Sequence, residues 1–346
     1  MDFSSLLIKW YKENKRDLPW RNTTDPYKIW LSEIILQQTR VDQGLNYYLK
    51  FIENFPTIID LANSKEEKVL KLWQGLGYYS RARNLHFTAK YIQKNYNGTF
   101  PVNYKEILAL KGVGEYTAAA ISSFSFNMSY PVVDGNVYRV LARFFDINTP
   151  IDSTLGKKEF KALAEELIDK KNPAEYNQAI MEFGALQCKP KQPNCENCIF
   201  NSKCLALKND NISILPIKEK KTKVKNRFFN YLVFSDKKHT LIKNRTEKDI
   251  WQGLFDFPLI ETVKPIHQFE KLNLEQYKIL NTLTDKSIQK SIEYIHILSH
   301  QKIHATFWSI QIDDISCVQN DELKIIKEEI VKYPVPKLIE NFIFKK

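Results

Sequence analysis

The sequence Leu-Lys-Gly-Val-Gly-Glu-Tyr-Thr-Ala-Ala-Ala-Ile occupies residues 110–121 and joins two segments with the apolar pattern of helices. Gly112 and Gly114 flank a single valine, apolar residues precede them, and an alanine-rich run follows. This arrangement predicts two helices joined by a tight hairpin. The backbone N–H groups at the start of the second helix would form a site for one phosphate. An ordinary helix-turn-helix corner has the same pattern, so other motifs must decide between the two.

On the N-terminal side of this hairpin, Asp25 and Pro26 have the residue types of a helix N-cap and first helical position. We expect the helix that they open to extend over residues 27–45. Glu33 lies within it among apolar residues. A carboxyl group in such surroundings tends to have a raised pKa and can remain an acid near neutral pH. A glutamate on the polar stripe of a surface helix is the competing interpretation.

The chain changes character after about residue 206. Residues 136–188 have helical periodicity, and residues 1–206 contain no convincing alternating strand, so this region is predicted to be all-α. Residues 207–225 carry six lysines against two acidic residues, which is typical of a basic linker. Beyond it, β-branched and aromatic runs at 228–234, 240–243 and 305–312 predict strands, and 321–332 has a helical pattern. Residues 226–346 are therefore expected to form an α+β domain.

Four cysteines within seventeen residues give the sharpest chemical signal. Cys188, Cys195, Cys198 and Cys204 follow the spacing C-x6-C-x2-C-x5-C, while Cys317 is remote. Because cytosolic disulfides are rare and no export signal is evident, this spacing points to a metal. Zinc and an iron-sulfur cluster both accept four thiolates, and the presence of a single C-x2-C pair makes zinc the weaker alternative.

Composition limits the classes of protein that remain. The chain has 346 residues, 43% of them apolar, and a net charge of +11, which suits a folded protein that meets phosphates. No apolar run approaches the roughly 20 residues that span a bilayer. The N-terminus interleaves lysines and has no signal-peptide pattern. We therefore expect a cytoplasmic protein without a membrane partner.

Several runs, taken together and in order, resemble the adenine glycosylase family of the endonuclease III superfamily. They are Leu18 to Arg21, Asp25 to Val41, Gly75 to Asn84, Gly112 to Ile121, Asp134 to Arg143, Glu182 to Leu186 and the cysteine loop. The resemblance implies a helix-hairpin-helix glycosylase fold, with a six-helix barrel at about 25–135. It also implies an iron-sulfur subdomain from 1–24 and 136–206, with a [4Fe-4S] cluster on the four cysteines. Residues 226–346 resemble a Nudix-like 8-oxoguanine recognition domain that lacks the Nudix catalytic box.

The resemblance also implies an activity and its catalytic residues. The family excises adenine mispaired with 8-oxoguanine or guanine from duplex DNA, by hydrolysis of the N-glycosidic bond. Glu33 matches the acid, Asp134 the carboxylate that stabilises the sugar cation, and Tyr116 and Asn136 the residues that position them. Bifunctional members carry a lysine where this chain has Tyr116, and a tyrosine cannot form a Schiff base. We therefore expect a monofunctional enzyme that acts as a monomer.

Further residues match binding positions of the family. Arg21 and Gln178 would hold adenine, while Gln37, Gln38 and Tyr78 would enter the duplex; helix surface and core packing are their competing interpretations. The hairpin, with Lys111, Gly112, Val113 and Gly114, would grip a phosphate. Ser299 and His300 match a loop that reads oxidised guanine, with Leu298 in place of the usual phenylalanine. His296, His300 and His304 have a spacing that could bind metal on a helix, but the flanking β-formers favour separate roles.

Two rival functions remain at this point. The first is an endonuclease III-like glycosylase and lyase acting on oxidised pyrimidines, against which Tyr116 and the additional domain argue. The second is a non-catalytic DNA-binding or redox-sensing iron-sulfur protein that uses the same fold. Such a protein would bind DNA and release no adenine.

Overall fold

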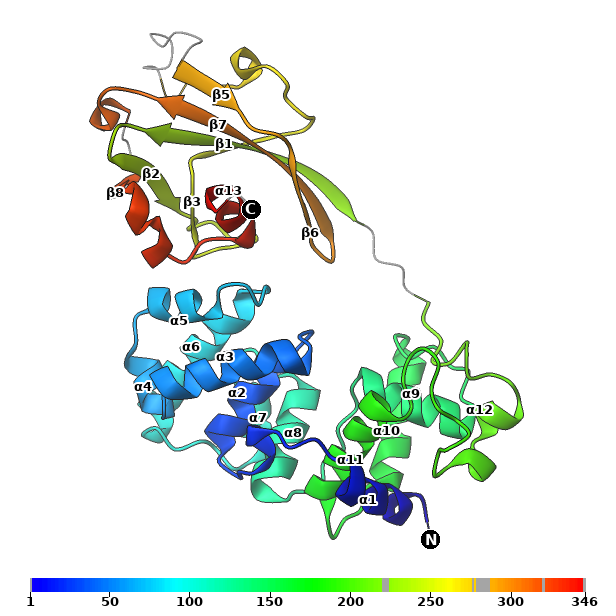
Figure 1. The fold of residues 1–346 in the computed structure, drawn as a ribbon. Helices are drawn as coiled ribbons and strands as arrows, with labels where there is room; N and C mark the ends of the chain where they lie inside the picture. The colour runs from blue at the N-terminus through cyan, green and yellow to red at the C-terminus, as the bar shows by residue number, and fades with distance from the viewer. Residues whose placement is uncertain (1, 220–223, 276, 278–286, 319–320, 345–346) are drawn as a thin grey trace. The chain divides into compact units, whose positions relative to one another are not determined.

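The computed structural model describes residues 2–219, 224–275, 277, 287–318 and 321–344. The chain forms two compact units (Figure 1). Met1–Asn63 and Asn84–Lys220 make up a helical unit, and Ser64–Arg83 and Lys221–Lys346 make up a unit built around a sheet. Within the described residues, no helix combines the length and the apolar character needed to cross a bilayer.

The first unit consists of helices, and no strand occurs among its described residues, so the all-α prediction for residues 1–206 is confirmed. Its longer helices are α1 (Phe3–Asn14), α2 (Pro26–Leu36), α3 (Val41–Asn54), α8 (Glu115–Phe126), α9 (Gly135–Phe145), α10 (Thr154–Leu167) and α11 (Pro173–Leu186), together with α6 (Ser80–Tyr96) from Asn84 onward. The shorter ones are α4 (Ile58–Asn63), α7 (Tyr104–Ala109), α12 (Leu205–Lys208) and the 3-10 turns Pro19–Arg21 and Asn201–Lys203.

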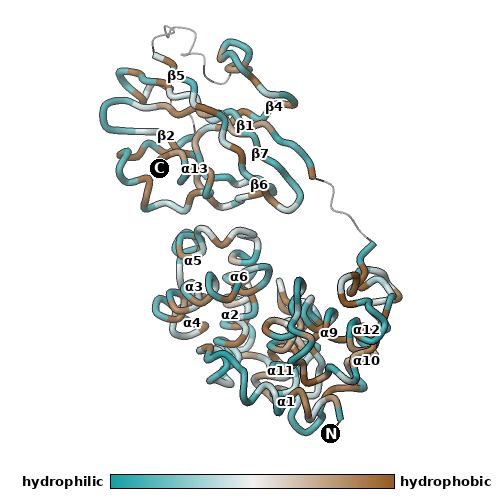
Figure 2. The backbone as a smooth tube through the Cα atoms, turned by 45° about the vertical axis from the view of Figure 1, so that its right-hand side comes forward, coloured by the Kyte–Doolittle hydropathy of each residue, from teal (hydrophilic) through white to brown (hydrophobic). Residues whose placement is uncertain are grey.

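Helices α1, α9 and α11 pack against one another around an apolar core, where brown segments gather in Figure 2. Trp10 of α1 contacts the edge of Phe183 of α11, with ring centroids 5.0 Å apart. Phe183 in turn meets Phe200, which precedes α12, at 5.2 Å. Edge contacts between large rings bury much apolar surface and add specific geometry. This core fixes the position of α11, which supplies several side chains to the candidate site.

The expected helix over residues 27–45 is interrupted, and that prediction is wrong at residues 37–40, which separate helix α2 from a second helix. Helix α2 ends at Leu36, residues 37–40 form a turn with Gln38 at φ +54°, and α3 begins at Val41. The turn lets α3 pack back onto α2, where a Cβ on Gly44 would lie 2.6 Å from a methyl of Leu36. Local periodicity could not show the break, because it arises from this packing.

The Gly-rich stretch forms the predicted hairpin between α7 and α8. Gly112 has φ +84°, a left-handed conformation that glycine adopts without strain. A Cβ at this position would also lie 2.8 Å from the Cβ of Asn84. Val113 is buried beneath the hairpin, while its neighbours on both sides are exposed. The hairpin is therefore anchored by one apolar side chain and presents backbone to the solvent.

The second unit contains α5 (Glu66–Trp73) and an eight-stranded sheet whose main order is β3-β2-β1-β7-β5. The strands are β1 (Lys225–Ser235), β2 (His239–Asn244), β3 (Phe255–Asp256), β4 (Leu259–Thr262), β5 (Ile288–Lys290), β6 (Tyr294–Ile297), β7 (Gln301–Gln311) and β8 (Leu323–Ile326). The two long strands β1 and β7 run parallel and in register from Lys225 opposite Gln301 to Ser235 opposite Gln311. The other pairs are antiparallel, so the sheet is mixed.

Both faces of this sheet are covered, which agrees with the predicted α+β class. On one face, Phe307 of β7 stacks on Phe342 of α13 (Lys337–Ile343), with centroids 3.9 Å apart. On the other face, Leu232 and Trp308 belong to a second apolar cluster. The helix expected at 321–332 is wrong: its first part is strand β8, paired with β2, and its second part is the 3-10 helix Lys327–Lys332. The side chain of Cys317 lies outside the described residues.

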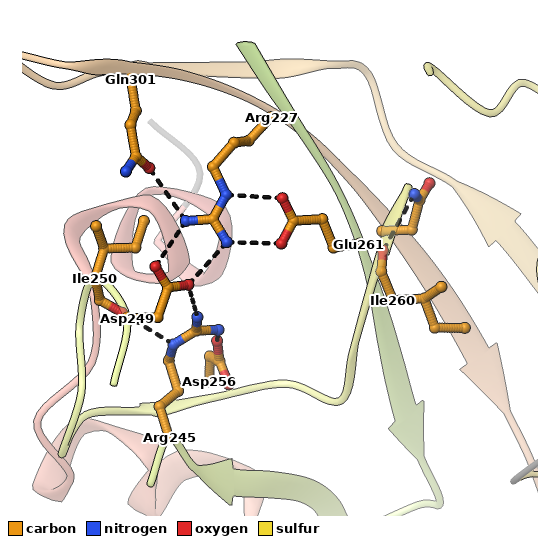
Figure 3. Close-up of polar contacts among 9 residues, drawn as sticks. Arg227, Arg245, Asp249, Ile250, Asp256, Ile260, Glu261 and Gln301 are labelled. Atoms are coloured by element: carbon orange, nitrogen blue, oxygen red, sulfur yellow. Dashed lines mark hydrogen bonds and ion pairs between the residues drawn. The ribbon is translucent and has the colours of Figure 1, made fainter. Parts of the chain in front are cut away.

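Two arginines tie the loop before β3 to the sheet (Figure 3). Arg227 of β1 forms paired hydrogen bonds with Asp249, both 2.8 Å long, and with Glu261, 2.7 and 2.6 Å long. Arg245 bonds to Asp249 at 3.0 Å and to the buried Asp256 at 2.8 Å. Arginine suits this role because its planar group binds two carboxylates at once.

Candidate active site

One cavity in the helical unit brings together residues that are far apart in the sequence. It spans about 840 Å³, including space open to solvent, and lies among α2, α8, α9 and α11. Six of the predicted site residues line it: Arg21, Glu33, Tyr116, Asp134, Asn136 and Gln178. Leu18, Trp20, Ile29, Leu36, Val41, Phe124 and Ala185 supply apolar walls. Both carboxylates therefore face the same space, which is apolar over much of its surface.

Glu33 is a buried acid in the middle of α2, with a fractional exposure of 7%. Burial raises the pKa of Glu33 to about 7, and the negative charge of Asp134 adds to this rise. A hydrogen bond with Tyr116 and the charge of Arg21 act in the opposite direction. Because its pKa is close to neutrality, Glu33 can hold a proton in the cavity and also give it up.

Asp134 is held in one orientation as the N-cap of α9. One of its oxygens accepts hydrogen bonds from the backbone N–H groups of Asn136 and Val137, each 2.8 Å long. The other oxygen accepts from the side-chain amide of Asn136, also at 2.8 Å. Burial raises the pKa of Asp134, and these three hydrogen bonds oppose the rise by stabilising the charged form. The arrangement provides a fixed carboxylate beside the cavity.

Tyr116 connects the two catalytic candidates to the hairpin, since it is the second residue of α8. Its hydroxyl hydrogen-bonds with Glu33 and lies 3.8 Å from the sulfur of Met181. Burial raises the pKa of Tyr116 well above its usual range, so the phenol stays protonated and neutral. A neutral phenol can orient Glu33, but it is not an amine nucleophile.

Glu182 forms buried ion pairs with two arginines beside the cavity, and sequence reasoning did not single it out. Its side chain is 1% exposed and accepts hydrogen bonds from Arg21 at 2.8 and 2.7 Å and from Arg16 at 2.9 and 2.6 Å. Burial by itself would raise the pKa of Glu182, but these bonds outweigh it and lower the pKa to about 2. Arg21 is thus fixed at the cavity wall by a partner that remains charged.

Gln178, on the same face of α11 one turn before Glu182, lines the cavity. Its side-chain oxygen accepts a hydrogen bond of 2.5 Å from the hydroxyl of Tyr11. Tyr11 is a buried residue of α1, outside the cavity lining. Within the part of the chain that the structure describes, the amide nitrogen of Gln178 makes no hydrogen bond. It is therefore available to an occupant of the cavity.

The remaining predicted binding residues do not line this cavity. Gln37 and Gln38 occupy the turn after α2, and the amide of Gln37 lies 3.4 Å from the hydroxyl of Thr117. Tyr78 and Ser299, both in the second unit, are hydrogen-bonded through their hydroxyls. Ser299 and His300 are exposed at the tip of the hairpin between β6 and β7.

The three histidines at four-residue intervals do not share a helix. His296 lies in β6, His300 in the turn and His304 in β7. His304 stacks on Phe228 with ring centroids 5.0 Å apart, and its ring nitrogen lies 3.2 Å from Glu293. The pattern is therefore not a helical metal motif, as the surrounding β-formers indicated.

The hairpin has the features of an anion site. Gly114 is the N-cap of α8 and offers no side chain to the first-turn N–H groups, which remain available to an external acceptor. Lys111 is exposed, and its ammonium group lies 4.3 Å from the ring centroid of Phe87. The carbonyl of Lys111 accepts a hydrogen bond of 2.8 Å from Thr88. Both the helix dipole and the lysine favour negative charge here.

The four predicted cysteine ligands line a second cavity, of about 410 Å³. Arg143 is 2% exposed and binds this loop: it donates to the sulfur of Cys188 at 3.5 Å and to the carbonyl of Lys189 at 2.7 Å. Burial raises the pKa of Cys195, Cys198 and Cys204, in the case of Cys198 to about 11. No group of three or more Cys, His, Asp or Glu within the described ranges converges closely enough to hold a single metal ion.

Sequence reasoning overlooked three residues that the folded chain brings to these sites: Glu182, Tyr11 and Arg143. Each belongs to a segment of recognisable pattern, but its role depends on a partner more than 40 positions away. A charged residue within an otherwise apolar helix was the available signal for Glu182 and Arg143. No signal in the sequence distinguished Tyr11.

Comparison with known proteins agrees with this architecture. The fold and site define a helix-hairpin-helix DNA repair protein: residues 31–170 match the HhH-GPD superfamily base excision DNA repair protein family, and residues 230–345 match the NUDIX domain family. Among solved structures, a thermostable thymine-DNA glycosylase has a TM-score of 0.56 and 31% identity, covering 60% of this chain and 95% of that chain. An endonuclease III in a non-covalent DNA complex, at 22% identity and a TM-score of 0.52, shares the fold and covers 60% and 94%.

The similarity to individual relatives extends over nearly the whole chain. The adenine DNA glycosylase of Buchnera aphidicola subsp. Schizaphis graminum is 34% identical over 349 residues, which covers 98% of each chain. The human adenine DNA glycosylase is 42% identical over 213 residues, covering 59% of this chain and 39% of that one. The chain belongs to the adenine DNA glycosylase family, and the resemblance noted in the sequence is confirmed. It is an enzyme of the glycosylase class.

Proposed function

We propose that the protein removes adenine mispaired with 8-oxoguanine or guanine from duplex DNA by hydrolysing the N-glycosidic bond. The observation that carries this proposal is the single cavity in which Glu33, with its pKa raised to about 7, faces the capped carboxylate of Asp134. Two carboxyl groups with different environments can divide the roles of acid and anion. Membership of the adenine DNA glycosylase family supports the choice of base.

Adenine leaves poorly as an anion, so its departure requires protonation of a ring nitrogen. Protonated Glu33 is the acid that supplies this proton, because burial raises its pKa to about 7 and a large fraction of it is therefore protonated near neutral pH. As the bond breaks, positive charge develops on the sugar. Asp134 stabilises that charge as a fixed anion, since its hydrogen bonds hold the carboxylate in place before the reaction. Glu33, once ionised, then accepts a proton from the attacking water.

We assign the binding of the extruded adenine to Gln178 and Arg21, which line the cavity. Within the described residues the amide nitrogen of Gln178 makes no hydrogen bond, and Arg21 is fixed there by Glu182. The apolar residues around them favour a planar base over water. Extrusion of a base costs a few kcal/mol of stacking and pairing. We assign Gln37, Gln38 and Tyr78 to the filling of the gap that it leaves.

The enzyme is proposed to be monofunctional. Strand cleavage by a lyase requires an amine that attacks the sugar, and the position after the hairpin holds Tyr116, a neutral phenol bonded to Glu33. Lys111 lies on the hairpin itself and beside Phe87. We assign it to a phosphate, together with the backbone N–H groups that follow Gly112. Base loss therefore leaves an intact strand with an abasic site.

Recognition of the opposite base is assigned to the second unit. Ser299 and His300 are exposed at the tip of the β6–β7 hairpin, where a hydroxyl and an imidazole can meet a base edge. Leu298, which replaces an aromatic residue of the family, is bonded through its backbone to Gln301 at 2.8 Å. We propose that the polar pair reads 8-oxoguanine and that the protein acts as a monomer.

We propose that Cys188, Cys195, Cys198 and Cys204 hold a [4Fe-4S] cluster. The donor set fits, since four thiols, the ligand type of such clusters, line one cavity. Bound there, the cluster would cross-link the loop after α11 and would replace the thiol protons. Lys189, Lys191 and Lys203 are exposed around the loop and give it a positive surface suited to DNA.

A base-release assay tests the proposed function. Purified protein is incubated with duplexes containing A opposite 8-oxoguanine, A opposite G, A opposite C, and thymine glycol, and the strands are resolved with and without alkali. We expect adenine release, fastest opposite 8-oxoguanine, with strand breaks that need alkali. Release of thymine glycol with spontaneous breaks would instead identify a lyase on oxidised pyrimidines. DNA binding without base release would identify a non-catalytic protein.

A further inference from the structure

Tyr11 does not line the cavity, but it contacts Gln178, a residue that does. Its hydroxyl donates to the side-chain oxygen of Gln178 at 2.5 Å, and its ring lies 5.7 Å from the guanidinium carbon of Arg21. The residue is 3% exposed, so its position in α1 is fixed by packing. Burial raises the pKa of Tyr11, with a partly opposing effect of the Arg21 charge, and the phenol therefore keeps its proton. Gln178 thus faces a permanent hydrogen-bond donor.

This contact decides which end of the Gln178 amide faces which neighbour. A carboxamide has an acceptor oxygen and a donor nitrogen of nearly equal shape, and rotation by half a turn exchanges them. In the observed orientation the oxygen accepts from Tyr11. In the reversed orientation the NH2 group would approach the hydroxyl, and the phenol proton would lose its acceptor. Across the described part of the chain, Tyr11 and Gln178 have no other side-chain hydrogen bond, so nothing else favours the reversed state.

The orientation matters because purines differ in the groups on their edges. A glutamine recognises adenine by accepting a hydrogen bond from the N6 amine and donating one to the neighbouring ring nitrogen. A carbonyl oxygen has two lone pairs, so Gln178 can accept from Tyr11 and from the base at once. Hypoxanthine carries a carbonyl oxygen where adenine carries the amine. A fixed glutamine oxygen would face that carbonyl oxygen, which is repulsive.

We infer that Tyr11 is a positioning residue that locks the Gln178 amide in the orientation complementary to adenine and so sets the preference for adenine over 6-oxopurines. This inference rests on the proposed function, because it assigns Gln178 to the extruded base. Tyr11 acts through Gln178 and touches no reacting atom. The measurable consequence is a ratio of two rates, which a general loss of stability would not change.

The test compares Tyr11→Phe with the wild-type holoenzyme. Duplexes carry adenine or hypoxanthine opposite 8-oxoguanine, and single-turnover rates and substrate Kd are measured for each. Phenylalanine keeps the ring and its packing and removes only the hydroxyl. We expect adenine excision to slow by about tenfold, as for the loss of one oriented hydrogen bond, with hypoxanthine excision changed by less than about threefold. The ratio of the two rates then falls.

Two variants provide the controls. Tyr176→Phe removes a hydroxyl from α11 that has no hydrogen-bond partner among the described residues and lies in a residue 2% exposed, so it should leave the ratio unchanged. In a Gln178→Ala background, Tyr11→Phe should cause no further loss, because its effect passes through the amide. Thermal unfolding of each variant establishes that it is folded.

The outcomes distinguish a failure of the role inferred for Tyr11 from a failure of the proposed function. An unchanged ratio in an active Tyr11→Phe enzyme would overturn the role of Tyr11 and leave the proposed function intact. An equal slowing on both bases, or an undiminished effect in the Gln178→Ala background, would likewise reject it in favour of a structural role. A wild-type protein that releases no adenine would reject the proposed function, and the inference with it.

Discussion

Replacement of Glu33 by glutamine separates the proton that we propose this residue supplies from the space that it fills. Glutamine has nearly the shape of a protonated glutamate, but it neither ionises nor acts as an acid. The buried side chain contacts Tyr116 and faces Asp134, and both surroundings stay in place. We expect Glu33→Gln to abolish base release while DNA binding is largely retained. We also expect it to remove a pH dependence of folding stability.

The magnitude follows from the pKa of Glu33, which rises from the ordinary 4.5 to about 7 in the folded protein. Such a rise corresponds to about 3 kcal/mol between the two protonation states. Because the folded-state pKa is the higher one, the folded protein binds more protons than the unfolded chain between these values. The wild-type protein therefore loses about 3 kcal/mol of stability as the pH rises from about 4.5 through about 7. The variant lacks this loss.

Two measurements check these effects. Single-turnover base release from an A:8-oxoguanine duplex gives the chemical effect, with DNA affinity measured on the same duplex. Urea unfolding between about pH 5 and about pH 8, followed by the helical circular-dichroism signal, gives the difference in stability between variant and wild type. Glu53→Gln is the matched control, since Glu53 is an exposed glutamate of α3.

The expected result is a variant that becomes more stable relative to wild type as the pH rises, while Glu53→Gln follows the wild type. A stability difference that stays flat across the pH range would show that Glu33 has an ordinary pKa in the folded protein. Base release by Glu33→Gln at more than half the wild-type rate would remove Glu33 from the acid role. Either result would refute the reasoning from burial to catalysis.

Asp134→Asn should slow base release by at least about a hundredfold, because the negative charge is lost. The free energy of unfolding should change by less than about 0.5 kcal/mol, because asparagine is an equally good N-cap for α9. Single-turnover rates and thermal melts separate the two. The pKa of Glu182 is lowered to about 2 in the folded protein. The ionised side chain therefore contributes about 3 kcal/mol of folding stability above about pH 4.5, and this stability is lost as the pH falls toward 2. Urea unfolding of Glu182→Gln should show both a lower stability at neutral pH, from two arginines left unpaired, and the absence of this acid dependence. Cys198→Ser should reduce the iron bound per protein and its visible absorbance, measured against the wild type purified in parallel. The double change Ser299→Ala and His300→Ala should leave release from A:G duplexes nearly unaltered and abolish the rate advantage of A:8-oxoguanine.

Much of the helical unit could be predicted from local sequence. Asp25 caps α2, Pro26 begins it, and the two glycines of the hairpin lie between α7 and α8 as expected. These features depend on contacts within a few residues, so composition and spacing are sufficient to indicate them. The clustering of four cysteines is equally local and indicated a metal site without reference to the fold.

The wrong predictions have a common cause. The helix expected at 27–45 is interrupted because α3 folds back onto α2, and the segment at 323–326 is a strand because β2 provides a partner for it. In both segments the apolar pattern was compatible with a helix. Packing against a segment distant in the chain decided the outcome, and such packing has no local signature.

The sequence by itself indicated the family, the order of the motifs and two carboxylates as candidates for catalysis. Only the tertiary structure decided that residues 33 and 134, a hundred positions apart, face one cavity, because α2 and α9 meet only in the folded chain. It also decided their unequal acidity, since the pKa of a carboxyl group depends on burial and on the donors around it. The pairing of Arg21 with Glu182, and of Tyr11 with Gln178, arises in the same way. The chemical groups are encoded locally, but their electrostatic environment is a property of the packed fold.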